Sequence, residues 1–211
     1  MGQKVNPVGF RLGVKFDWKS RWFAEDKEDY KKYLLEDIKI RKFLRNRLAQ
    51  AGLSRVEIER TREKIALTIF VARPGIVIGR GGTGLAELKK ELLSRLGLSS
   101  PAKLKLEVRE VKNPDLDAYL VALWAAKQLE RRMPYRGVMR RVVERVMAAG
   151  AKGVKIMLSG RIAGAEIARK EYLSKGIISL GTLRTKVDFA HVPALTKYGY
   201  IGVKVWINKG E

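Results

Sequence analysis

The residues best suited to ligand chemistry form a glycine-rich stretch, residues 75–84 (GIVIGRGGTG), in which five of ten residues are glycine. Within it, Gly79, Arg80, Gly81 and Gly82 make a G-x-x-G loop that contains a cation. Glycine allows a positive φ and places no Cβ between the backbone and a ligand. Leucines at helical spacing follow the loop, and the N-terminus of a helix attracts anions. The stretch therefore predicts a phosphate-binding loop.

Three kinds of phosphate site contain a glycine-rich loop of this type. A Walker-type loop requires Lys-Ser/Thr after its last glycine, and the sequence does not provide it. A dinucleotide fingerprint fits Gly79, Gly81 and Gly84, with Glu107 or Glu110 as the ribose carboxylate. That fingerprint starts directly after a parallel strand, but a Pro-Gly pair intervenes here and the preceding strands are expected to be antiparallel. The third alternative is the loop of a KH domain, which clamps the backbone of a few nucleotides.

A second cationic feature is a predicted helix over about residues 134–149, with valines and a methionine on one face and arginines on the other. A solvated helix face usually mixes charges of both signs, whereas arginine dominates this one. Because the guanidinium is a planar donor of several hydrogen bonds, such a face favours phosphate binding. The arginines of this helix and of the residues just before it are Arg131, Arg132, Arg136, Arg140, Arg141 and Arg145.

The first 24 residues combine glycine, proline and isolated basic residues with interleaved aromatic residues, and show no helical or strand period. We interpret them as an extended basic arm that becomes ordered on nucleic acid, in preference to a flexible terminus. The residues assigned to nucleic-acid binding in this arm are Lys4, Asn6, Arg11 and Lys15.

The elements around the glycine loop have a recognisable order. A helix is predicted over about residues 26–51, and strands over residues 55–59 and 65–71 are joined by a hairpin loop at residues 60–63. A short helical turn at residues 76–78, the loop, a further helix and a strand over residues 103–109 follow. This order of helix, strand, strand, helix, loop, helix and strand is that of a type II KH domain.

Beyond a boundary at residues 113–115, the second half is predicted to be α+β with an antiparallel sheet. Helices are expected over residues 115–133, 134–149 and 163–173. Strands are expected over about residues 154–159, 182–192 and 200–207, the last two joined by a hairpin connection at residues 193–199. The expected domains are therefore an arm (1–24), a KH domain (25–112) and a C-terminal α/β domain with an antiparallel-rich sheet (113–211).

Composition limits the possible functions. The 211 residues include 44 Lys and Arg against 22 Asp and Glu, and the net charge of +22 favours a polyanionic partner. There is no cysteine, and the single histidine, His191, has no partner set at metal-ligand or catalytic spacing. We therefore expect no catalytic residue, metal, cofactor or small-molecule substrate. No apolar run reaches the length of a membrane span, so we also expect no membrane partner.

Four segments together resemble ribosomal protein three of the bacterial small subunit. They are residues 1–13 (MGQKVNPVGFRLG), 72–79 (ARPGIVIG), 159–169 (SGRIAGAEIAR) and 200–207 (YIGVKVWI). The resemblance runs along nearly the whole chain. It implies a cytoplasmic ribosomal protein in the head of the small subunit that contacts 16S rRNA and neighbouring proteins, notably the tenth and fourteenth.

In that family, the arginine-bearing helix borders the channel through which mRNA enters, and its basic residues are implicated in holding and unwinding mRNA. Arg136 and Arg140 match two of the implicated positions, and Gly137 stands where many relatives carry another arginine. We therefore expect a structural ribosomal protein that binds rRNA and lines the mRNA path. The alternatives are a free KH-domain regulator of RNA and a nicotinamide-dependent oxidoreductase.

Overall fold

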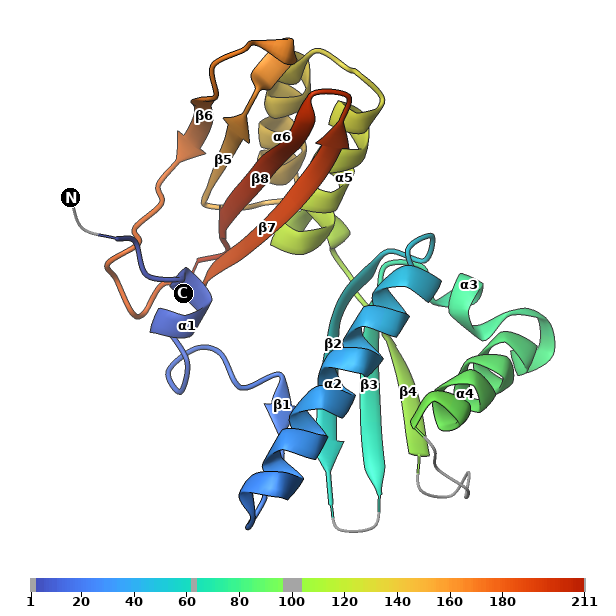
Figure 1. The fold of residues 1–211 in the computed structure, drawn as a ribbon. Helices are drawn as coiled ribbons and strands as arrows, with labels where there is room; N and C mark the ends of the chain where they lie inside the picture. The colour runs from blue at the N-terminus through green and yellow to red at the C-terminus, as the bar shows by residue number, and fades with distance from the viewer. Residues whose placement is uncertain (1–2, 62–63, 97–103, 211) are drawn as a thin grey trace. The chain divides into compact units, whose positions relative to one another are not determined.

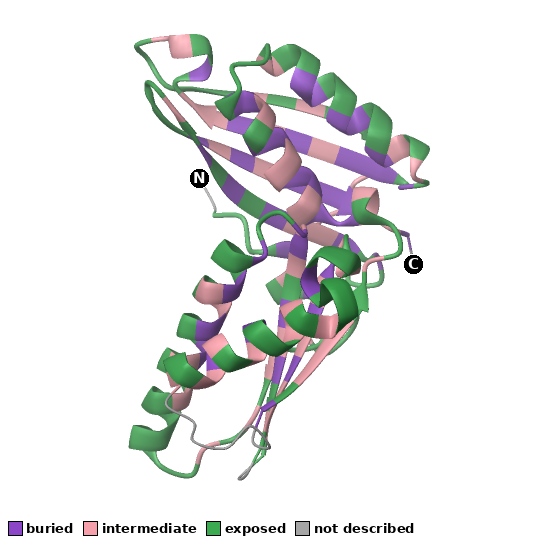
Figure 2. Cartoon of the chain, turned by 90° about the vertical axis from the view of Figure 1, so that its right-hand side faces the viewer, coloured by how far each residue is buried: buried purple, intermediate pink, exposed green. Residues whose placement is uncertain are grey.

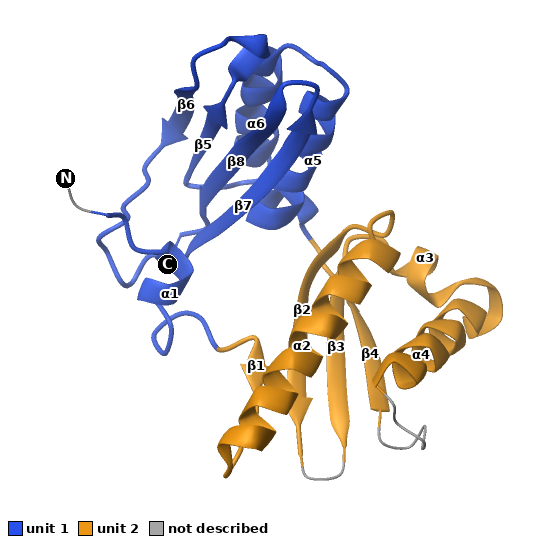
Figure 3. Ribbon diagram, viewed as in Figure 1, with its two compact units in different colours: residues 1–17, 113–211 blue, residues 18–112 orange. Residues whose placement is uncertain are grey.

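The computed structural model describes residues 3–61, 64–96 and 104–210 and is drawn in Figure 1. The chain forms two compact units, residues 18–112 and residues 1–17 together with 113–211 (Figure 3). The first 24 residues, expected to form one separate arm, are thus divided between the two units.

The unit of residues 18–112 contains a four-stranded sheet and three helices. Along the chain its elements are β1 (Ser20–Arg21), α2 (Lys27–Arg47), β2 (Leu53–Arg60), β3 (Ile65–Val71), α3 (Pro74–Ile78), a 3₁₀ turn (Arg80–Gly82), α4 (Thr83–Leu96) and β4 (Leu104–Glu110). The sheet order is β1-β2-β3-β4, with β2 and β3 antiparallel and β3 and β4 parallel. The elements from α2 to β4 follow the order expected of a type II KH domain.

One face of this sheet and the three helices share a single hydrophobic core. Alternate residues of β2 and β3, such as Ile58 and Leu67, are buried together with Leu44 of α2, Val77 of α3 and Leu92 of α4. Figure 2 shows the corresponding alternation of buried and exposed residues along strands and helices. The core fixes the angle at which α3 meets α4, and the glycine loop lies between these two helices.

Residues 18–23 are attached to this unit by a polar cluster around Asp37, which is 3% exposed. Arg60 Nη2 lies 2.6 Å from Asp37 Oδ1, while Trp22 Nε1 and Ser20 Oγ donate to Asp37 Oδ2 at 2.9 and 2.8 Å. A buried carboxylate needs such partners, because an unpaired buried charge is strongly destabilising. The Asp37 cluster thus makes β1 and Trp22 part of the folded unit.

The other unit contains two long helices and a four-stranded antiparallel sheet. Its elements are α1 (Pro7–Phe10), a 3₁₀ turn (Pro114–Leu116), α5 (Ala118–Glu130), α6 (Tyr135–Ala148), β5 (Gly153–Gly160), a 3₁₀ turn (Ile162–Gly164), β6 (Arg169–Gly176), β7 (Val187–Thr196) and β8 (Gly199–Asn208). The sheet order is β6-β5-β8-β7, and every neighbouring pair is antiparallel.

Helices α5 and α6 cover one face of this sheet (Figure 1). The Asp117 side chain accepts hydrogen bonds from the backbone N–H groups of Tyr119 and Leu120, at 3.0 and 3.1 Å, and so caps the start of α5. Helix α6 begins directly after Pro134, which is favoured at helix starts. The α+β class and the antiparallel sheet expected from the sequence are confirmed. Among the described residues, no helix is long and apolar enough to cross a membrane.

The predicted helix over residues 163–173 is wrong. Its residues form a 3₁₀ turn and then strand β6, which pairs with β5 over eight residue pairs. The predicted strand at residues 182–192 begins later, at Val187, and continues past Pro193 to Thr196. Pro193 is tolerated there because β7 is an edge strand. Two further expectations fall partly outside the described residues: the hairpin loop at residues 60–63 and the start of the strand at residue 103.

Candidate nucleic-acid interface

The glycine loop adopts backbone angles that favour glycine. Gly79 (φ +69°), Gly81 (φ +60°) and Gly82 (φ +81°) all have positive φ. An added Cβ at Gly81 or Gly82 would meet no atom within 4 Å, so these two positions are open to an approaching ligand. Arg80, between Gly79 and Gly81, is exposed. The four predicted residues therefore form one exposed turn with a cation inside it.

Close packing explains the outer glycines. A Cβ at Gly84 would lie 2.8 Å from the carbonyl oxygen of Val77, and a Cβ at Gly79 would lie 3.0 Å from the backbone nitrogen of Gly84. Thr83 Oγ1 donates to the carbonyl oxygen of Arg80 at 3.0 Å and closes the turn. Helices α3 and α4 thus approach each other closely on either side of the loop.

The dinucleotide alternative lacks its structural context. Helix α3 separates β3 from Gly79, and β3 is antiparallel to β2, as expected. Glu107, which would have held a ribose, instead accepts a hydrogen bond from Arg109 Nε at 2.8 Å, and this bond lowers the pKa of the Glu107 carboxyl group. The loop geometry therefore favours a nucleic-acid backbone over a dinucleotide.

The arginine-rich helix is α6, and it separates apolar and cationic residues as predicted. Val138, Met139, Val142, Val143 and Val146 are buried. By the 100° rotation per residue of a helix, Arg136 and Arg140 lie along one edge of the exposed face, and Arg141 and Arg145 lie along the other. Arg131 and Arg132 lie just before the helix. All six predicted arginines are exposed: Arg131, Arg132, Arg136, Arg140, Arg141 and Arg145.

These arginines differ in their contacts within the chain. Arg145 Nη2 lies 2.5 Å from Asp115 Oδ1, and its guanidinium lies 4.9 Å from the centroid of the Trp124 ring. Arg136 Nε donates to the Tyr135 hydroxyl at 3.1 Å. Arg140 and Arg141 have no side-chain partner in the described part of the chain. The free donors of the helix are therefore concentrated at Arg140 and Arg141, whereas Arg145 is partly neutralised.

One cation beside α6 was missed by the sequence interpretation. Arg169 of β6 directs Nη2 toward the Tyr135 hydroxyl at 3.5 Å, and Tyr135 is the residue that also accepts from Arg136. Arg169 belongs to the stretch that was predicted to be helical, and its position next to α6 depends on the pairing of β6 with β5. No local pattern in the sequence indicates that pairing.

The predicted arm residues do not form one surface. Lys4, Asn6 and Lys15 are exposed, but Arg11 is fully buried, with 0% exposure. The Arg11 guanidinium donates to the carbonyl oxygens of Pro7, Ser179, Leu180 and Thr182 at 2.7–3.1 Å. The assignment of Arg11 to RNA binding is therefore replaced by a structural role.

Asn6 is also engaged, since its side chain accepts hydrogen bonds from the N–H groups of Val8 and Gly9 and caps α1. Among the described residues, no group of three or more His, Asp or Glu side chains could hold a metal ion. His191 is an exposed residue of β7. The two candidate sites are thus the glycine loop in one unit and the arginine face of α6 in the other.

Two known families match successive parts of the chain. Residues 39–116 match the family described as KH domain, and residues 125–207 match the family described as ribosomal protein S3, C-terminal domain. The first range contains the glycine loop. The second contains α6 and the antiparallel sheet.

Curated relatives match the chain from end to end. The small ribosomal subunit protein uS3 of Caldicellulosiruptor saccharolyticus is 51% identical over 211 residues, which are 100% of this chain and 93% of the relative. The proteins of the same name from Dichelobacter nodosus and Desulfitobacterium hafniense are 51% and 49% identical over the whole chain, which covers 86% and 94% of them. The relatives are thus named as ribosomal subunit proteins, and none of these names indicates an oxidoreductase.

Proposed function

The chain belongs to the small ribosomal subunit protein uS3 family, and we propose on this premise that the exposed arginines of α6 hold mRNA as it enters the subunit. The chain is a structural constituent of the small ribosomal subunit, not an enzyme.

The observation that carries the mRNA proposal is the concentration of exposed arginines on one rigid helix. The buried valines of α6 hold the helix against the sheet, so Arg136 and Arg140 are presented from a fixed backbone. Arginine binds phosphate through several donors at once. A row of such groups captures the strands of an opening RNA duplex by charge alone, and this requires no nucleotide hydrolysis.

A double substitution, Arg136→Ala with Arg140→Ala, tests this role in ribosomes that carry the variant protein. We expect slower translation through a stable mRNA hairpin and little change on an unstructured mRNA, because strand capture matters only where a duplex must open. The matched control is Lys39→Ala with Lys42→Ala, which removes two exposed cations from α2. Equal slowing on both mRNAs would contradict the proposal.

Gly137 provides the complementary test. It lies on the exposed face of α6, and an added Cβ would meet no atom within 4 Å. Gly137→Arg therefore adds a cation between the two arginine edges without strain. It also removes a helix-interior glycine, which costs about 1 kcal/mol relative to alanine. We expect faster passage through the same hairpin. Gly137→Ala separates the gain in helix stability from the gain in charge.

We assign rRNA contacts to the glycine loop and to the exposed residues Lys4 and Lys15. The open glycines Gly81 and Gly82 allow a phosphate backbone to approach, and Arg80 supplies charge. Arg80→Glu should weaken incorporation of the protein into small subunits, measured by co-sedimentation through a high-salt wash. A free KH-domain regulator would instead be released by that wash.

Contacts with the tenth and fourteenth small-subunit proteins remain part of the proposal, since the family resemblance implied them. Crosslinking followed by mass spectrometry of assembled subunits tests them directly. Crosslinks from this chain to both proteins are expected. Crosslinks to other small-subunit proteins alone would contradict the assignment.

A further inference from the structure

The four-stranded sheet of the C-terminal unit has two unlike faces. One is covered by α5 and α6 and contains buried residues such as Ile156 and Val205. Neither α5 nor α6 lies over the other face (Figure 1), although the short helix α1 contacts β7. Because side chains alternate along a strand, the residues between the buried ones belong to this second face. We call it the open sheet face and define it by Lys155, Met157, Lys170, Tyr172, His191 and Lys204.

The strand register places these residues next to one another. Met157 of β5 lies opposite Tyr172 of β6 on one side and Lys204 of β8 on the other, and Lys204 lies opposite His191 of β7. One row across all four strands therefore contains two planar rings, a methionine and a lysine. Lys155 lies two residues before Met157 on β5 and occupies the next row on the same face.

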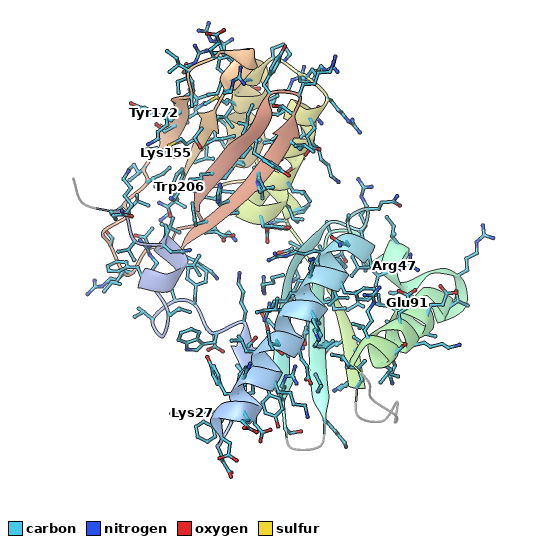
Figure 4. All side chains as sticks on the ribbon, in the orientation of Figure 1. Lys27, Arg47, Glu91, Lys155, Tyr172 and Trp206 are labelled. Carbon is cyan, nitrogen blue, oxygen red and sulfur yellow. The ribbon has the colours of Figure 1, made fainter. Side chains whose placement is uncertain are left out.

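Side-chain contacts confirm that Lys155 and Tyr172 share a face with Trp206. The Lys155 ammonium nitrogen lies 5.0 Å from the ring centroid of Tyr172 and 5.9 Å from that of Trp206, and Figure 4 labels all three residues. Trp206 is 7% exposed and packs against Phe189, with ring centroids 5.2 Å apart. Tyr172 is 66% exposed. The face thus combines a packed aromatic pair, Phe189 and Trp206, with the exposed rings of Tyr172 and His191.

The charge of this face has a single sign. Lys155, Lys170 and Lys204 lie on it. The strands β5 to β8 contain two carboxylates, Glu171 and Asp188, and both alternate to the helix-covered face. Asp188, for example, accepts from the backbone N–H of Ala118 at the start of α5.

We propose that the open sheet face binds an unpaired segment of RNA, with bases stacked on Tyr172 and His191 and phosphates held by Lys155, Lys170 and Lys204. Stacking on exposed rings tolerates any base, and lysines beside the rings neutralise the backbone. Both parts of this chemistry are present here. A protein partner would have to supply carboxylates for three lysines and cover an exposed tyrosine hydroxyl. This inference does not depend on the role of α6.

The test is photocrosslinking of the full-length protein to a single-stranded oligouridine that contains 4-thiouridine, with the crosslinked peptides identified by mass spectrometry. We expect crosslinks in β6 at Tyr172 and in the neighbouring strands. Excess unlabelled single-stranded RNA should abolish them, and the same mass of duplex RNA should compete poorly, because paired bases cannot stack on the face.

Three variants make the result specific. Tyr172→Ala should lower the crosslink yield at the open sheet face about tenfold, and Tyr172→Phe should retain it, because the ring provides the stacking. Tyr198→Ala, which removes an exposed tyrosine from the turn between β7 and β8, should change nothing. Undiminished yield in Tyr172→Ala would overturn the proposal. Crosslinks confined to the glycine loop and α6 would also overturn the proposal. They would indicate that the open sheet face binds a protein instead of RNA.

Discussion

Two arginines of this chain show how burial decides what a residue does. Arg140 is exposed on α6 and has no side-chain partner among the described residues. Arg11 is enclosed and donates to four backbone carbonyl oxygens that belong to residues 7 and 179–182. Desolvation by burial lowers the pKa of the Arg11 guanidinium, but the carbonyl dipoles stabilise its charge. Arg140 is thus available to an anion, while Arg11 joins two distant parts of one unit.

At the residue scale, Arg11→Ala should destabilise the unit formed by residues 1–17 and 113–211. The substitution leaves several carbonyl oxygens without a donor, and we expect a loss of about 3 kcal/mol and a Tm lower by roughly 10 °C. Thermal unfolding followed by circular dichroism measures this. Lys4→Ala, an exposed control in the same segment, should change the stability by less than about 0.5 kcal/mol. An unchanged Tm for Arg11→Ala would show that the guanidinium does not hold this segment.

The sequence did not distinguish Arg11 from Lys4 or Lys15, because all three are isolated basic residues in a segment without periodicity. Three of the four carbonyl groups that accept from Arg11 belong to residues 168–171 positions later. No local pattern can indicate such a contact. The glycine loop, in contrast, was predictable because its conformation is determined by the glycines themselves.

At the scale of elements, the loop is a close junction between α3 and α4. The glycines differ in what limits them: Gly84 faces the carbonyl oxygen of Val77 at a distance that leaves no room for a Cβ, whereas Gly75 has nothing within 4 Å. A glycine in this stretch is therefore required for helix packing at some positions, whereas at others it leaves the backbone open to a ligand.

Gly84→Ala should therefore destabilise the unit of residues 18–112 by about 1–3 kcal/mol, because the added methyl group forces α3 and α4 apart. Gly75→Ala should be nearly neutral and is the matched control. Chemical denaturation followed by hydrogen exchange of the β2 and β3 amides measures the difference within this unit. Equal stability of the two variants would contradict the packing argument.

Helix propensity misled the interpretation of residues 163–173. The stretch contains three alanines and two glutamates, with one arginine, one lysine and one leucine, and all of these residue types favour helices. In the structure, residues 169–176 extend the sheet as strand β6, and Ala163 has a positive φ of 57° in the preceding turn. Eight cross-strand pairs with β5 outweigh the local preference. The correction matters for function, because it brings Arg169 beside Tyr135 and places Tyr172 on the open sheet face.

At the scale of the whole molecule, the net charge of +22 is distributed over several surfaces. Exposed cations lie on the glycine loop, on α6 and on the sheet of the C-terminal unit. The many positive charges of such a protein repel one another, and binding to polyanionic RNA reduces that repulsion. Composition alone could predict the class of partner, and the order of elements could predict the KH fold. Which cations are free to bind depended on contacts that only the folded chain reveals.

The number of arginines that contact RNA should appear in the salt dependence of binding. For a single strand, the logarithm of affinity falls with the logarithm of salt concentration by about 0.7 per phosphate contact. Arg136→Ala with Arg140→Ala should therefore reduce the slope by about 1.4. Arg145→Ala should reduce the slope by less than the value for one phosphate contact, because Asp115 already pairs with that side chain. Binding titrations in a series of KCl concentrations measure the slopes, and an equal effect of Arg145 and Arg140 would contradict the assignment.

The central claim is that the exposed arginine face of α6 lies on the path of mRNA in the small subunit. The most direct measurement places a photocrosslinking amino acid at position 140 in assembled subunits that hold a defined mRNA, and then identifies the attached nucleotides. We predict crosslinks to mRNA nucleotides that have not yet entered the decoding site. Crosslinks from position 140 to ribosomal RNA alone, with none to mRNA, would contradict the account.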